Sequence, residues 1–180
     1  MSLVAISGNA SGTGTLTIAA PNTNSNYTLN LPAATGTVMV SGNMPAFSAY
    51  ANTTTTLTAN TDVKVTFDVE LFDTASCFSS SRFTPNVAGY YIVNVCLNVN
   101  FWNGTIFSAL VYKNGSVYQT GQTAYPQTVG GVRASISTLV YLNGTTDYIE
   151  GYGYQYAVTS NNVVTASQNT TFSACLVRAA

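Results

Sequence analysis

Histidine is absent from this chain of 180 residues, and only 6% of its residues are charged. Acid and base catalysis uses a group that titrates near neutral pH, usually histidine, so Ser-His and Cys-His nucleophiles are excluded. The chain also has no cluster of basic residues with which to bind nucleic acid. Its cations are scattered at Lys64, Arg82, Lys113, Arg133 and Arg178. We therefore expect a protein that is not an enzyme and binds no nucleic acid.

Long apolar runs are missing too. No stretch approaches the length needed to cross a bilayer. The N-terminus has neither the basic region nor the long apolar core of a secretory signal. These absences predict a protein that is made in a cytoplasm, is not exported by the ordinary route and has no membrane partner.

Cysteine is scarce. Three cysteines, Cys77, Cys96 and Cys175, are an odd number without regular spacing, which does not indicate a disulfide framework. Small buried thiols are the simplest interpretation. Cys96 lies on the polar face of its predicted strand and could instead meet a neighbouring subunit.

The clearest pattern in the sequence is a long alternation after residue 90. From Tyr91 to Phe101 every odd position is apolar, whereas the even positions, apart from Ile92, are Asn or Cys. This period of two predicts a long strand with one face against a core. We expect a turn before it, where Pro85 presets φ and Gly89 can take a positive φ.

Asn-Gly, a strong short signal for a β-hairpin, occurs three times. The pairs, with the strands that each is expected to join, are 103–104 between 91–101 and 106–112, 114–115 between 110–113 and 117–120, and 143–144 between 136–142 and 148–156. The sequence has no helical periodicity of useful length. It therefore predicts an all-β sandwich or jelly roll with almost no helix.

Another alternation, over 63–71, sets apolar residues against Lys64, Asp68 and Glu70. We expect a solvated strand face on which Lys64 forms charge pairs with the two carboxylates.

Tyrosines lie at alternate positions near the C-terminal end. They are Tyr148, Tyr152, Tyr154 and Tyr156, with Gly151 and Gly153 on the opposite face. Aromatic rings stack on sugars, so this stripe could be a carbohydrate-binding platform. The favoured interpretation is a core or a subunit interface, where tyrosine is enriched. The glycines would then permit close approach between strands or subunits.

Residues 1–44 contain no charged side chain and are dominated by Gly, Ser, Thr, Asn and Ala. Three short strands are expected over 15–19, 27–31 and 37–40. Their apolar side chains form a core too small to stand alone. These are Leu16, Ile18, Tyr27, Leu29, Leu31, Val38 and Val40. The segment therefore needs a partner, either its symmetry mates or another protein.

Several segments, in the right order, resemble the globular head of the complement C1q and tumour necrosis factor superfamily. They are AFSAY at 46–50, VKVTFDVELFD at 63–73, SRFTPNVAGYYIVNV at 81–95, YLNGTTDYIEGYGYQ at 141–155 and TFSACLV at 171–177. The resemblance implies a ten-stranded jelly roll over about residues 45–180 that assembles as a homotrimer. Members of this family can bind Ca²⁺, so Asp62, Asp68 and Asp73 are weak candidates for a calcium site with loop carbonyls. No other cofactor is expected.

Residues 14–42 resemble segments that recur in bacteriophage virion proteins, commonly as intertwined trimeric stems or attachment arms before a C-terminal module. This resemblance implies a virion protein with an attachment arm at 1–44 and a jelly-roll knob at 45–180. The predicted hinge is at 43–45, because Pro45 restricts Met44 to an extended conformation.

The expected function is therefore structural. A trimeric capsid decoration or cement protein would be assembled in the host cytoplasm and would dock its arm on the major capsid protein or another virion protein. The shortness of the chain, which begins at a plausible initiator Met1, favours this role. The alternative is the tip of a tail or head fibre, acting as an adhesin that binds host-surface glycans.

Overall fold

The structure is a computed structural model, and it describes residues 8, 11–19, 21–28, 30, 33, 35, 36, 38–40, 42, 44–101, 106–125, 130–157, 159–166 and 169–180. The chain divides into two units, Met1–Gly36 and Thr37–Ala180. The boundary predicted after residue 44 lies inside the second unit, where Met39 packs against the core. We refer to the second unit as the knob.

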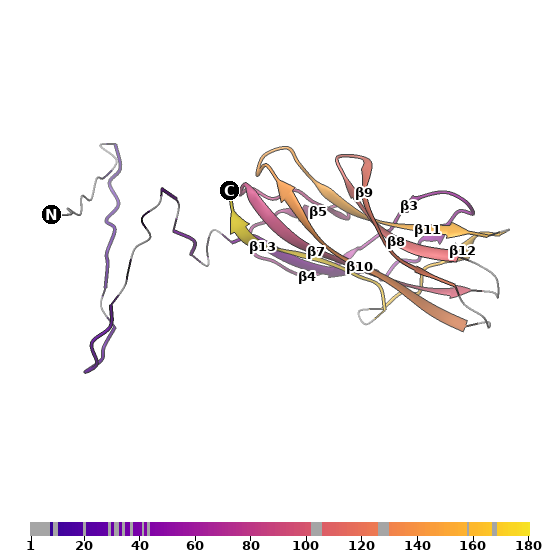
Figure 1. Cartoon of the computed structure of the whole chain (residues 1–180), viewed down its shortest axis with the longest axis horizontal. Coiled ribbons are helices and arrows are strands. Elements are labelled where there is room, and N and C mark those ends of the chain that lie inside the picture. Colours follow the sequence, from indigo (N-terminus) through magenta and orange to yellow (C-terminus); the bar gives the residue numbers. More distant parts are fainter. Residues whose placement is uncertain are drawn as a thin grey trace. The chain divides into compact units, whose positions relative to one another are not determined.

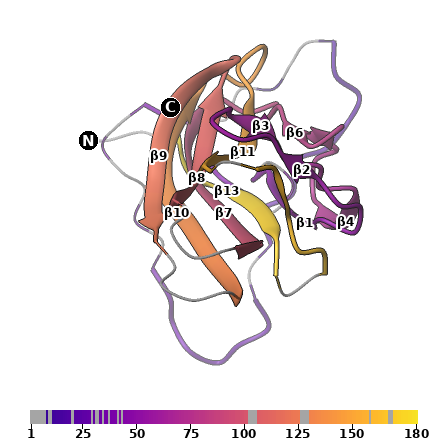
Figure 2. The same cartoon turned by 90° about the vertical axis from the view of Figure 1, so that its right-hand side faces the viewer.

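The knob is built from β-strands in antiparallel sheets, as Figures 1 and 2 show. The first sheet has the order β10 (Gly130–Leu142), β7 (Gly89–Phe101), β13 (Thr171–Ala179), β1 (Ala46–Tyr50) and β4 (Val69–Asp73). The second has the order β5 (Phe78–Ser79), β6 (Arg82–Phe83), β11 (Ile149–Tyr156), β8 (Ile106–Lys113) and β9 (Ser116–Ala124), and β3 (Val63–Lys64) also pairs with β11. A small third sheet pairs β12 (Asn161–Asn162) with β2 (Thr56–Leu57). The described residues contain almost no helix, and no helix among them is long and apolar enough to span a membrane.

The chain crosses repeatedly between the two large sheets, which is the path of a jelly roll. Asn114-Gly115 forms the predicted hairpin between β8 and β9, with φ values of 52° and 80° at its two residues. The hairpin prediction at 143–144 is wrong, because β10 and β11 lie in different sheets. The third pair, at 103–104, lies outside the described residues, and the strands on either side of it, β7 and β8, also lie in different sheets.

Strand β7 confirms the longest alternation. Its inward side chains are almost completely buried: Tyr91, Val93, Val95, Leu97 and Val99. It is paired along its whole length with β10 on one side and from Gly89 to Cys96 with β13 on the other. The core beneath includes a cluster of rings in which Phe47 stacks at 4.5 Å on Phe78 and at 4.6 Å on Phe83. Because this strand has neighbours on both sides and a sheet opposite, every inward side chain finds a partner.

Gly89 differs from its prediction. It is not among the glycines with positive φ. It lies inside β7, where a Cβ atom would come within 2.4 Å of the carbonyl oxygen of Arg178 and 2.7 Å of Leu176. Close packing against β13, rather than a turn, requires glycine here.

The segment 63–71 is a strand only at its ends, β3 and β4. Val65 and Phe67 point into the core as predicted, but the alternation stops at Leu71, which is exposed. Between the strands the backbone is held by a side chain, because the N–H group of Phe67 donates to the hydroxyl of Ser81 at 2.8 Å. The buried hydroxyl of Ser81 thus accepts the hydrogen bond that a strand carbonyl would accept in a β-sheet.

Within the first unit the described residues form no strand. The strands predicted over 15–19 and 27–31 therefore do not form in the single chain, as far as their residues are described. Two or three apolar side chains per segment bury too little area to offset the entropy of ordering it.

Candidate functional surfaces

The described attachment residues of the first unit, Met1–Gly36, which we call the N-terminal segment, are exposed. Leu16, Ile18 and Tyr27 expose 80%, 80% and 77% of their surface, and Val38 and Val40, in the second unit, are exposed as well. Leu29 and Leu31 lie outside the described residues. Clustered exposed apolar residues usually mark a surface that another molecule covers. Their role in virion attachment stays a prediction.

The tyrosine stripe lies on the outer face of the second sheet, so the part of the prediction that placed it in a core is wrong. On β11, Gly151 and Gly153 point inward, where added Cβ atoms would lie 2.9 Å from Phe67 and 3.0 Å from Leu57. These glycines allow the two sheets to approach each other. The tyrosines at alternate positions therefore point outward, and Tyr156 is the most exposed of them.

Neighbouring side chains hold the stripe. Tyr112 of β8 stacks on Tyr152 with 3.7 Å between ring centroids, and the hydroxyl of Tyr112 donates to Asp62. Burial, followed by this hydrogen bond, raises the pKa of Tyr112 well above its ordinary value. The guanidinium carbon of Arg82 lies 3.8 Å from the centroid of the Tyr148 ring, a cation–π contact. Two of the four tyrosines of the stripe, Tyr148 and Tyr152, are thus in contact with neighbouring side chains of the knob.

A buried carboxylate lies in the same row. Glu150 is 3% exposed, and its Oε1 accepts from Lys64 Nζ at 2.7 Å and from Arg82 Nε at 2.9 Å. Burial alone would raise the pKa of Glu150, but the hydrogen bonds from Lys64 and Arg82 outweigh it and hold the pKa below its ordinary value. The predicted pairing of Lys64 with Asp68 and Glu70 is wrong, because β3 pairs with β11 and brings Lys64 to Glu150 instead.

Asp68 has a different task. It accepts hydrogen bonds from the backbone N–H groups of Asn52 and Thr53 and from the hydroxyl of Thr53. The hydroxyl of Thr53, followed by the N–H group of Asn52, lowers the pKa of Asp68 to about 2. The carboxylate fixes the loop that follows β1.

The calcium candidates do not converge. Asp62 accepts from Tyr112, Asp68 from the loop after β1, and Asp73 from the N–H groups of Ala75 and Phe78. The part of the chain that the structure describes contains no group of three or more Asp, Glu, Cys or His side chains that could hold a metal ion. Asp68 and Asp73 hold local backbone, and Asp62 holds the Tyr112 side chain.

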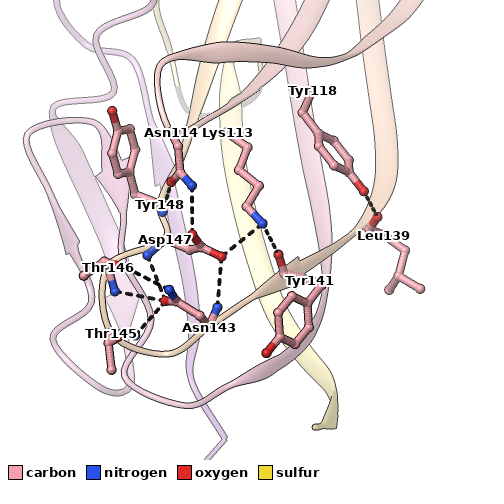
Figure 3. A network of polar contacts seen from close by, with 10 residues as sticks. All are labelled: Lys113, Asn114, Tyr118, Leu139, Tyr141, Asn143, Thr145, Thr146, Asp147 and Tyr148. Carbon is pink, nitrogen blue, oxygen red and sulfur yellow. Dashed lines mark hydrogen bonds and ion pairs between the residues drawn. The ribbon is translucent and has the colours of Figure 1, made fainter.

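A polar network joins the β8–β9 hairpin to the connection between β10 and β11 (Figure 3). Asp147 forms an ion pair with Lys113 at 3.0 Å and accepts from Asn114 Nδ2 at 2.8 Å. The side-chain oxygen of Asn143 accepts from the N–H groups of residues 145–147, which folds this connection into a tight turn. Asn114 thus links the two turns, whereas Asn143 holds its own turn together.

A polar cavity of about 450 Å³ lies beside the end of β7 and strand β12 of the third sheet. Its lining carries no charge and includes Asn100, Ser160, Asn161 and Asn162. The fully buried Gln155 positions one wall: its amide donates to the carbonyls of Leu57 and Thr159, and its oxygen accepts from Asn161 at 2.8 Å. Beyond a general richness in amides, no pattern in the sequence predicts this cavity.

Large apolar side chains are exposed on the outer face of the first sheet, a surface that sequence reasoning missed. They are Phe72 on β4, Tyr90 on β7, Leu139 and Tyr141 on β10, and Val177 on β13. Tyr90 and Tyr141 face each other in register, with ring centroids 5.5 Å apart. The available signal was Tyr90 and Ile92, the apolar residues at even positions of β7. We call these five residues the outer apolar face.

The cysteines are all free, as expected, but only Cys77 is buried. Cys96 is half-buried and Cys175 is exposed, so the prediction of small buried thiols holds for one of three.

Comparisons with solved structures agree with this architecture. The globular domain of zebrafish complement 1qA is similar over 76% of this chain and 99% of its own, with a TM-score of 0.54 and 17% identity. Murine APRIL is similar over 74% of this chain and 99% of its own, with a TM-score of 0.60 and 8% identity. Eiger TNF from S. frugiperda covers 76% of this chain and 93% of its own, with a TM-score of 0.53 and 11% identity.

No protein-family model and no curated protein sequence matches the chain. Identities this low carry fold but not activity. The knob is a jelly roll of the C1q and tumour necrosis factor type, as the sequence resemblance implied.

Proposed function

We propose that this chain is a non-catalytic, homotrimeric protein of the bacteriophage virion surface. The N-terminal segment docks on the capsid or another virion protein, and the knob projects as a decoration. Three arms on one trimer turn three weak contacts into one strong attachment, because the second and third contacts form at high effective concentration.

The observation that carries this proposal is the exposure of an uncharged, partly apolar segment. Leu16, Ile18 and Tyr27 are presented to solvent, and residues 1–44 have no charge to keep such a segment soluble on its own. A partner that supplies strand edges would bury these side chains and satisfy the backbone at once.

The outer apolar face supports self-association. Five large apolar side chains are exposed there, whereas the tyrosine stripe exposes mainly Tyr156. A subunit interface is expected where exposed apolar side chains are concentrated. We therefore propose the outer apolar face, rather than the tyrosine stripe, as the principal trimer contact.

Attachment is tested with the purified chain and virions stripped of it. Full-length protein is expected to rebind such particles, and a protein lacking residues 1–36 is expected to stay folded and lose rebinding. Leu16→Ser together with Ile18→Ser should weaken rebinding, while Thr15→Ser in the same segment should not. Rebinding by the truncated protein would overturn the docking role.

Trimer formation is tested separately by sedimentation. Leu139→Glu introduces a charge on the outer apolar face and should yield monomers, whereas Tyr154→Glu on the stripe should leave the trimer intact. The reverse result would restore the stripe as the interface.

A second function, glycan binding by a fibre tip, is favoured by the uncharged cavity beside Asn100 and Asn161. Amides and hydroxyls on a rigid wall are suited to neutral sugars. Saturable binding of the whole protein to host cells, with block of infection, would favour this role over decoration. Binding to stripped particles alone would favour decoration.

A further inference from the structure

A second cavity, of about 450 Å³, lies at the edge of the second sheet beside β3, β5 and β6. Two cations reach it, in a chain that has only five. Its lining residues are Lys64, Ser76, Cys77, Ser79, Ser80, Arg82 and Thr84. No carboxylate belongs to the lining, so the cavity gathers positive charge and hydroxyl groups.

Glu150 does not fully cancel the charge of the two cations, although Asp68 and Glu70 line an adjoining cavity that shares Ser79 and Ser80. Lys64 and Arg82 share one carboxylate, Glu150, and both donate to the same oxygen atom. Two cations and one anion leave one net positive charge. Asp73 lies outside the lining and accepts from the backbone N–H groups of Ala75 and Phe78. Burial raises the pKa of the Cys77 thiol, so it stays neutral and adds no negative charge near neutral pH.

Both cations are held in place before any ligand arrives. The ammonium group of Lys64 donates to the carbonyl of Ser80 at 2.9 Å as well as to Glu150. The Arg82 guanidinium is fixed between Glu150 and the ring of Tyr148. Their side chains remain 33% and 44% exposed. A ligand that used these groups would therefore lose little side-chain entropy on binding.

The loop that carries the hydroxyls is also fixed. Ser80 and Ser81 form the turn between β5 and β6 with φ values of 52° and 57°, a left-handed conformation that serine seldom adopts. The buried hydroxyl of Ser81 anchors the turn to Phe67. Ser79 and Ser80 are thus presented on a rigid edge.

We propose that this cavity binds the acidic group of an anionic sugar, a carboxylate or a sulfate carried on a hydroxylated ring. Lys64 and Arg82 pair with the anion, since charge-assisted hydrogen bonds are the strong ones. The hydroxyls of Ser76, Ser79, Ser80 and Thr84 bond to the ring hydroxyls. The cavity volume lies in the range of small-molecule sites and leaves room for a sugar ring beside the anion. This site goes beyond virion attachment and concerns the knob alone.

The test is calorimetric titration of the full-length protein with two acidic sugars, methyl α-N-acetylneuraminate and galactose 6-sulfate. Methyl α-galactoside is the neutral comparison, and sodium sulfate is the comparison that lacks a ring. We expect binding of at least one acidic sugar, weaker binding at higher salt and no binding of the neutral sugar. Sulfate should bind more weakly than either sugar that binds.

Two variants test whether acidic sugars bind at Lys64 and Arg82. Lys64→Met and Arg82→Met each leave Glu150 one cationic partner, so the buried carboxylate stays paired. Each should weaken acidic-sugar binding about tenfold or more, as expected for loss of a hydrogen bond to a charged group. Lys113→Met removes the same charge near Asp147 and should change the affinity less than about twofold. Circular dichroism confirms that each variant is folded.

Equal affinity for the neutral sugar, no heat with either acidic sugar, or equal weakening by Lys113→Met would overturn the proposal. Sulfate binding as tight as the sugars would overturn its saccharide part. None of these results depends on attachment to virions, so failure here is distinguishable from failure of the decoration role.

Discussion

The knob and the N-terminal segment are made from similar residues and reach opposite states. Both are rich in Ser, Thr and Asn, and both contain alternating apolar residues. Yet Leu97 of β7 is fully buried while Leu16 is 80% exposed. The alternation of apolar and polar residues predicts which face of a strand would be buried. Whether that face is buried depends on how many strands surround it, and β7 has two neighbours and an opposing sheet.

The two regions also differ in what their polar side chains do. In the knob, Gln155, Ser81 and Asn143 bond to backbone groups and replace ladder bonds at turns and crossings. In the N-terminal segment, Ser, Thr and Asn are mostly exposed. Uncharged polar side chains can therefore either hold the backbone inside a fold or remain exposed where a partner could bind.

The largest effect is expected from matched leucine truncations in the two regions. Leu97→Ala should lower the free energy of unfolding by about 2–5 kcal/mol, because it leaves a cavity among fixed neighbours. Leu16→Ala should change it by less than about 0.5 kcal/mol. Urea unfolding of both variants measures the difference. Comparable losses would mean that the segment is already packed in the isolated protein.

Two glycines of the knob, one closely packed and one not, should differ in how much an alanine substitution lowers stability. Gly89→Ala should cost about 1–3 kcal/mol, because the new methyl group meets the fixed carbonyl of Arg178. The control is Gly131→Ala on the neighbouring strand, where the methyl group would meet the side chains of Asn98 and Asn100 at 3.4 Å. It should be close to neutral. Thermal unfolding compares the two, and a neutral Gly89→Ala would show that β13 can move away.

A smaller effect is expected from hydroxyl groups. Ser81→Ala leaves the buried N–H and carbonyl groups of Phe67 without their side-chain partner and should cost about 1–2 kcal/mol. Thr17→Ala in the exposed N-terminal segment should leave stability unchanged within about 0.5 kcal/mol. Chemical unfolding would contradict this contrast if the two substitutions had equal effects.

The β-strands were predictable because their determinants are local, whereas the jelly-roll topology was implied by the resemblance to the C1q and tumour necrosis factor superfamily. The alternation of β7 and the turn at Asn114-Gly115 depend on period and on positive φ, which the sequence displays directly. The pairings that involve distant segments were not predictable. Asn143-Gly144 has the residues of a hairpin turn, but its flanking strands enter different sheets.

The candidate sites depended even more on distant contacts. The alternation predicts partners for Lys64 four and six residues along its own segment. Its partner Glu150 is instead 86 residues away and becomes adjacent only when β3 pairs with β11. The cavity between Lys64 and Arg82 follows from the same pairing. The outer apolar face is likewise assembled from four strands, each of which supplies only one or two of its side chains.

The smallest expected effect is on the acid dependence of stability, which distinguishes the knob from the N-terminal segment. Residues 1–44 have no carboxyl side chain, so side-chain titration between about pH 2 and pH 5 reports the knob alone. The pKa of Asp68 is lowered to about 2, and the hydrogen bonds of Asp147 and Glu150 also hold their pKa values below the ordinary range. A lowered pKa adds stability that is complete above the ordinary value near 3.8 and is lost as the pH falls toward about 2.

The melting temperature should therefore be nearly constant above about pH 5 and fall below about pH 4. Asp68→Asn should reduce this fall, by less than about 1 kcal/mol of stability because solvent screens an exposed carboxylate. Glu70→Gln is the control, since Glu70 has no side-chain hydrogen bond or ion pair to a described residue and lies on the adjoining strand β4. If truncation of residues 1–36 changed the acid profile as much as Asp68→Asn does, the N-terminal segment would contribute to knob stability, and the contrast between the two regions would fail.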